Sequence, residues 1–169
     1  HQLLSQQWVE SFAKAFEKHY KDNAPDNTIL AYHKSRNKTE PDSPNRSEYL
    51  FGITLAASDS FISSQQKKEI QFIMEPIWQI ESELQKNMRE IADDFQKLIA
   101  GNAPWKMMVG PLTSNANAYL TDMAHLAKYV HATGLYFLLL PHPCDWATDR
   151  PKHWTLYEWD NSAWQEVKR

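Results

Sequence analysis

The sequence lacks most of the features that would assign it to a specialised class of protein. Cys144 is its only cysteine, so the chain cannot form an internal disulfide, and a reducing compartment such as the cytoplasm is expected. Its four glycines are all isolated, which excludes a glycine-rich phosphate-binding loop. No run approaches the roughly 18 apolar residues of a membrane span, and the first residues resemble neither a basic leader nor a signal core. The formal net charge of −3 at pH 7 indicates no general attraction to a polyanion.

The length and the hydrophobic pattern favour a single α/β domain over residues 1–169. Of the 169 residues, 42% are hydrophobic and 23% are charged, which is typical of a globular chain with one core. Apolar residues recur at helical spacing in three segments and as short runs or alternation elsewhere. We predict helices over 3–20, 87–100 and about 115–131, and strands over 28–32, 48–55, 71–83, 106–109, 135–140 and 153–159.

This order of elements predicts a mixed β-sheet flanked by helices. It runs helix, three strands, helix, strand, helix and two strands, so that a meander leads into two strand–helix–strand crossovers. Pro76 inside the third strand predicts an edge, a bulge or a strand start. Residues 57–70 are polar and are expected to form a loop or a solvated extension.

Two acids near the end of the third strand are candidates for metal binding. Glu81 and Glu83 are two residues apart, and in a strand such residues point to the same face. Paired carboxylates on a rigid strand can hold Mg²⁺, and a nearby lysine can position the attacking water in phosphodiester hydrolysis. The alternative is that Glu83 is a solvated strand end and that Glu81 pairs with a lysine.

The following helix supplies a second acid and a lysine. Asp94 and Lys97 are three residues apart and can therefore face one another. Asp94 flanks the apolar stripe of the helix, whereas Lys97 lies farther round. This position also fits an ordinary surface ion pair.

The strings that carry these residues resemble the PD-(D/E)XK nuclease-like superfamily. They are EYLFGI at 48–53, IESE at 80–83, DFQKLI at 94–99 and WKMMV at 105–109, and the likeness covers roughly residues 1–140. It implies a restriction-endonuclease-like fold and Mg²⁺-dependent cleavage of DNA or RNA. It also implies that Glu81 and Glu83 bind the metal and that Glu83, Asp94 and Lys97 act in catalysis, the lysine having moved from strand to helix.

One position departs from the family pattern. Gly52 stands where the resemblance implies a metal-binding aspartate, and it offers no side-chain ligand. Glu48 shares that face but lies about 13 Å away along a strand, and Asp59 could replace the aspartate only if the strand bulged. The family assignment therefore leaves two functions open, a metal-dependent nuclease and a catalytically inactive binding module that acts through protein or nucleic-acid contacts.

Other signals are weaker. The basic run at 33–38, with Arg46 and the pair Lys67 and Lys68, could contact phosphates or form a solvated hairpin tip. The zinc-type side chains of His142, Cys144 and His153 lack a fourth partner at a recognisable spacing. A homodimer is an open alternative.

Overall fold

The computed structural model describes residues 2–23, 28–33, 51–85, 87–146 and 153–168. The basic run from residue 34 onward, Arg46 and Glu48 lie outside these residues. In chain order the elements are α1 (Gln2–Asn23), β1 (Ile29–His33), β2 (Ile53–Ile62), β3 (Glu69–Ser82), α2 (Met88–Ala100), β4 (Trp105–Pro111), α3 (Ala116–Ala127), β5 (Gly134–Leu140), the short 3₁₀ helix η1 (Pro143–Asp145), β6 (Thr155–Trp159) and β7 (Trp164–Glu166).

The seven strands form one mixed sheet, in which each strand pairs with its neighbours in sequence. The pairs β3/β4 and β4/β5 are parallel, and all the others are antiparallel. The prediction of an α/β fold with a mixed sheet flanked by helices is confirmed. The short strand β7 was not predicted, because its three residues are too few to show a periodic pattern.

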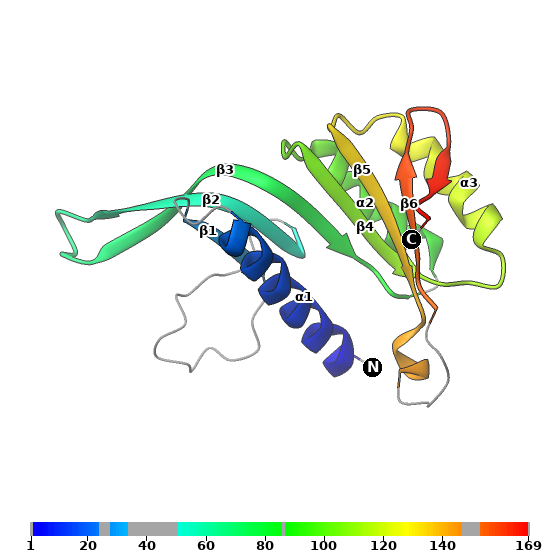
Figure 1. The fold of residues 1–169 in the computed structure, drawn as a ribbon, viewed down its shortest axis with the longest axis horizontal. Helices are drawn as coiled ribbons and strands as arrows, with labels where there is room; N and C mark the ends of the chain where they lie inside the picture. The colour runs from blue at the N-terminus through cyan, green and yellow to red at the C-terminus, as the bar shows by residue number, and fades with distance from the viewer. Residues whose placement is uncertain (1, 24–27, 34–50, 86, 147–152, 169) are drawn as a thin grey trace.

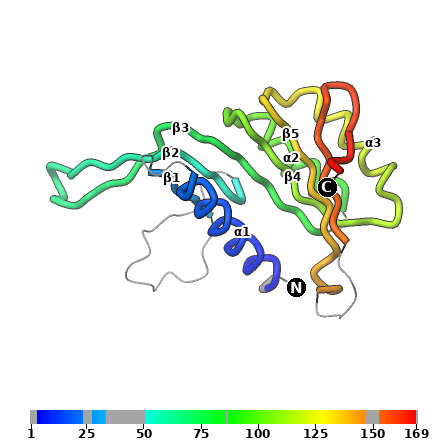
Figure 2. The backbone as a smooth tube through the Cα atoms, in the orientation of Figure 1, coloured from blue at the N-terminus to red at the C-terminus, as the bar shows by residue number. Residues whose placement is uncertain are grey.

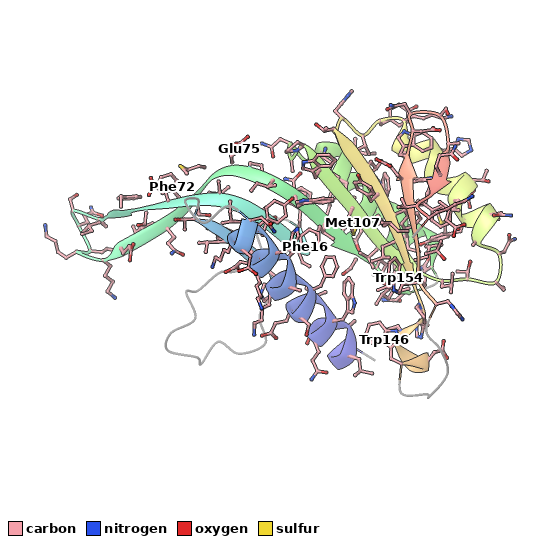
Figure 3. The ribbon with its side chains drawn as sticks, in the orientation of Figure 1. Phe16, Phe72, Glu75, Met107, Trp146 and Trp154 are labelled. Carbon is pink, nitrogen blue, oxygen red and sulfur yellow. The ribbon has the colours of Figure 1, made fainter. Side chains whose placement is uncertain are left out.

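Helices cover both faces of this sheet (Figure 1). Along β4 and β5 alternate residues belong to separate cores: Met108 and Phe137 pack with α2 and α3, whereas Met107 and Leu138 pack with α1. Because neighbouring residues of a strand point to opposite faces, α1 lies on one face and α2 with α3 on the other. Phe16 lies between α1 and the sheet (Figure 3). Its ring meets the ring of Trp78 edge-on, with the ring centroids 5.5 Å apart.

The second strand differs most from the prediction, whereas the third, expected over 71–83, is observed over Glu69–Ser82. Residues 57–62, expected in a loop or extension, continue β2, and β3 begins at Glu69, so the polar segment forms a hairpin arm that extends from the sheet (Figures 1 and 2). Backbone pairing between the two strands forms this arm without the apolar run that marks a buried strand. The irregularity expected at Pro76 is present, since the β2/β3 register shifts on both sides of its partner Ala56.

No helix among the described residues is long and apolar enough to cross a membrane.

Candidate functional site

The candidate site lies between β3 and α2. On β3, Gln79 and Glu81 are buried and face α2, whereas Ile80 belongs to the core under α1. The helix begins after Asn87, whose side chain accepts a hydrogen bond from the Arg89 N–H. Its buried stripe, Ile91, Phe95 and Leu98, sets its rotation against the sheet.

Lys97 lies at the centre of a cluster that it forms with Asp94 and Glu81. Its Nζ lies 2.7 Å from Asp94 Oδ1 and 3.5 Å from Glu81 Oε2. The ion pair with Asp94 was expected, but Lys97 was expected to point away from the buried part of the helix. The structure differs because four methylene groups let the ammonium reach back to the sheet, while 45% of the side chain stays exposed. Two carboxyl groups from different elements thus converge on one cation.

Glu83 makes different contacts. The strand assignment ends at Ser82, although the Glu83 N–H still donates to the Val109 carbonyl oxygen of β4 at 3.0 Å. The Glu83 carboxylate accepts a hydrogen bond from the Gln85 N–H at 2.7 Å. It also lies near Tyr119, whose phenol pKa is raised by burial and, to a smaller degree, by the Glu83 charge. The structure therefore places Asp94, and not Glu83, beside Glu81 at the lysine.

Burial controls the charge of the Glu81 carboxyl. Only 3% of the residue is exposed, and this desolvation raises its pKa from 4.5 to about 8. Lys97 and the Gly52 N–H, which donates to Glu81 Oε1 at 3.2 Å, oppose the rise, and Asp94 adds to it. Near neutral pH Glu81 therefore carries a proton in most molecules. Its longer distance from Lys97 fits this state, because Asp94 is then the charged partner.

The pKa of Lys97 is also raised, which for a lysine favours the charged form. Partial burial alone would lower its pKa, but the hydrogen bond from Lys97 to Asp94 and the attraction of Glu81 together raise it. The ammonium thus stays protonated over the range in which Glu81 titrates.

Gly52 lies directly beside this cluster. A Cβ atom placed on Gly52 would be 3.8 Å from Glu81 Oε2 and 3.3 Å from the Ile80 carbonyl oxygen. Gly52 does not adopt a positive φ, so its backbone does not require glycine. A side chain at this position would point toward the Glu81 carboxyl. Asp59 cannot take its place, because it lies seven residues farther along β2, about 23 Å at the rise of an extended strand.

A cavity of about 610 Å³ opens beside Lys97. It is lined by Phe51, Thr54, Ile73, Met74, Pro76, Gln79, Lys97, Ala100, Gly101 and Asn102. Buried Gln79 is held in place, since its Oε1 accepts from the Ala103 N–H at 3.0 Å and its Nε2 donates to Asn102 at 3.3 Å. The cavity therefore joins apolar walls to an ammonium group and two ordered amides.

Lys106 supports this cavity from within the protein, and the sequence indicated no role for it. The residue is fully buried on β4, and its ammonium donates to the carbonyl oxygens of Gly101 at 2.7 Å and His131 at 2.9 Å. It thereby ties the end of α2 to the segment before β5. A lysine inside the otherwise apolar string WKMMV was the available signal.

The donors present limit what the site could bind. Within the described ranges, no group of three or more His, Cys, Asp or Glu side chains is placed to hold a metal. Of the acids that the structure describes, Glu81 and Asp94 alone converge on one cation position, and two carboxylates can bind Mg²⁺ if water and substrate oxygens complete its shell. No protein-family model matches the chain, and no curated protein or solved structure is significantly similar to it.

Proposed function

We propose that this chain is a PD-(D/E)XK nuclease-like protein whose site at Glu81, Asp94 and Lys97 acts on the phosphodiester backbone of DNA or RNA. The observation that supports this is the convergence of three separate segments. Gly52, Glu81 and Lys97 come from the segment just before β2, from β3 and from α2, and they meet within a few ångströms. The resemblance implies the same three segments for one active site.

In this proposal each side chain has a distinct role. Glu81 and Asp94 would hold a divalent cation, and Lys97 would bind a phosphate oxygen or the attacking water. A bound Mg²⁺ would supply Lewis-acid polarisation of the phosphate and a more acidic water. The cavity beside Lys97 accommodates the nucleotide next to the scissile phosphate. Glu83, implied by the resemblance as a ligand and catalytic residue, has no assigned role here, because its carboxylate contacts Gln85.

A second function, nucleic-acid binding without cleavage, is favoured by two specific features. Gly52 supplies no carboxylate, and the raised pKa of Glu81 keeps a proton on the remaining strand acid near pH 7. Both weaken the binding of a divalent cation, because protons and metal compete for the same oxygen atoms.

The experiment that separates these functions restores the missing acid. Gly52→Asp places a carboxylate beside Glu81, and Gly52→Asn is the matched control with the same size and no charge. Plasmid nicking and cleavage of single-stranded DNA and RNA are measured with Mg²⁺ and with Mn²⁺. We expect Gly52→Asp to cleave faster than both the wild type and Gly52→Asn, and Lys97→Met in the same background to lose the gain.

The outcomes are distinct. Metal-dependent cleavage by the wild type that Glu81→Gln abolishes supports the nuclease. Binding of nucleic acid without cleavage, together with a gain in Gly52→Asp alone, supports the inactive binding module. If Gly52→Asp binds Mn²⁺ no better than Gly52→Asn in calorimetry, the three segments do not form a metal site and the proposal is wrong.

A further inference from the structure

Within the part of the chain that the structure describes, the hairpin arm of β2 and β3 has two free edges. On one side β1 pairs with β2 as far as Ala57, and the Ser58 N–H donates to the Thr28 carbonyl oxygen; on the other side β4 pairs with β3 only from Trp78 onward. Among the described residues, 59–62 of β2 and 69–76 of β3 therefore form a two-stranded ribbon (Figures 1 and 2). A two-stranded ribbon with unpaired edges is marginally stable in water by itself.

This arm also carries most of the large apolar side chains that the described residues expose. They are Phe61 at 52% exposed, Ile62 at 73%, Ile70 at 37%, Phe72 at 41% and Met74 at 57%. The ring centroids of Phe61 and Phe72 lie 6.1 Å apart, so these two side chains share one face of the arm. Exposed apolar residues beside an open strand edge are typical of a surface that pairs with another chain.

The free edge of β3 is regular over one short stretch. Glu69–Ile73 pair with β2 without interruption, and the register shifts just beyond Ile73. Bulges twist an edge away from further pairing, and the lysine pair at the tip limits the other end. The stretch that can accept another strand is therefore five residues long and is centred on Gln71.

We propose that a second copy of the chain pairs with this edge, antiparallel, with the two-fold axis at Gln71. A strand that pairs antiparallel with its own copy is two-fold symmetric, so one surface satisfies both partners. In this register Ile70 faces Phe72 of the partner subunit, and Phe72 faces Ile70 of the partner subunit. The apolar face of each arm then continues into that of the other as one four-stranded sheet.

The charges of the arm favour a second copy over nucleic acid. The register brings the exposed lysines at the tip, Lys67 and Lys68, alongside the exposed Glu75 of the partner subunit. Figure 3 shows Phe72 and Glu75 projecting from the arm. Residues 58–75 carry two lysines against three acids, Asp59, Glu69 and Glu75, which does not favour contact with a polyanion. This inference is independent of the proposed function.

Cysteine cross-linking tests the register. In a Cys144→Ser background, Gln71→Cys places two thiols opposite each other across the axis, with Cα atoms about 5 Å apart, within the range of a disulfide. Glu69→Cys is the matched control, because the two residues 69 would lie about 14 Å apart along the paired strands. We expect Gln71→Cys to form a covalent dimer under mild oxidation at low protein concentration, and Glu69→Cys to remain monomeric. Equal cross-linking of both variants would overturn the register.

Sedimentation of the unmodified chain tests the dimer itself. We expect a concentration-dependent dimer, which Phe72→Lys weakens about tenfold or more because it removes two symmetric cross-strand pairs. Ile62→Lys makes the same change on β2, away from the paired edge, and should leave the dissociation constant unchanged. Circular dichroism checks that both variants fold. A wild type that stays monomeric up to on the order of 100 μM, or a Phe72→Lys variant that weakens only nucleic-acid binding, overturns the proposal.

Discussion

Glu81→Gln tests whether burial keeps a proton on the central carboxyl of the site. In the unfolded chain this group titrates near 4.5, and in the folded chain its pKa is about 8. Between these values the folded state holds a proton that the unfolded state releases, so stability falls as the pH rises. Glu81 thus contributes its full stabilisation below about pH 4.5 and has lost it above pH 8.

The size of the effect follows from the same two values. Each pH unit within this window is worth about 1.4 kcal/mol, so the difference in unfolding free energy changes by roughly 5 kcal/mol between pH 4.5 and pH 8. Glutamine has the size of the protonated acid and does not titrate. We expect the two proteins to have similar stability near pH 5, and the glutamine variant to be more stable by several kcal/mol near pH 8.

Urea unfolding at half-unit steps from pH 5 to pH 9 measures this difference directly. Glu75→Gln is the matched control, since it removes an exposed glutamate from the same strand. A difference between wild type and Glu81→Gln that stays flat from pH 5 to pH 8 would refute the reasoning, because the folded carboxyl would then be ionised throughout. If Glu75→Gln shows the same pH-dependent difference in unfolding free energy, the effect arises from the net charge of the protein and not from the burial of Glu81.

Three further results are expected. Mn²⁺ binding to the wild type, measured by calorimetry, should strengthen by up to about tenfold per unit between pH 6 and pH 8, because the proton on Glu81 competes with the ion; an affinity independent of pH would contradict this. Gly101→Ala should lower the unfolding free energy by about 1–3 kcal/mol, because its Cβ would lie 2.1 Å from Gln79 Oε1, whereas Gly52→Ala, with no contact under 3.3 Å, should cost less. Lys106→Met should cost about 1–3 kcal/mol in chemical denaturation, because it removes the hydrogen bonds to two part-buried carbonyl groups; no loss would mean that water replaces the ammonium.

The two functions differ in what they require of Gly52. A nuclease needs enough negative charge to offset the dehydration of Mg²⁺, and among the described residues Glu81 and Asp94 alone lie at the cation position. A binding module needs only the lysine and the cavity beside it. The backbone of Gly52 accepts other residues. The aspartate variant therefore tests the chemistry with little change of fold.

The larger elements of the fold could be predicted because their patterns are local. The helix at α2 was expected over 87–100 and is observed over Met88–Ala100, since its apolar stripe and its capping residue both lie within the segment. The β2 part of the arm could not be predicted in the same way, whereas the β3 part lies within the strand predicted over 71–83. Residues 59–62 of β2 mix polar with apolar side chains and are largely exposed, and they depend on pairing with β3 rather than on a buried apolar face.

The candidate site likewise depends partly on local sequence and partly on the tertiary structure. By itself the sequence determined which residues could carry the chemistry, because Glu81, Asp94, Lys97 and the missing acid at position 52 are visible in short strings. Only the tertiary structure decided which of them meet. Strand alternation paired Glu81 with Glu83, but the Glu83 carboxylate accepts from the Gln85 N–H, and a long lysine side chain brings Asp94 to the cluster instead. The proton on Glu81 was likewise hidden, since burial depends on segments distant in the chain, and desolvation sets the charge of a carboxyl more strongly than its neighbours in sequence.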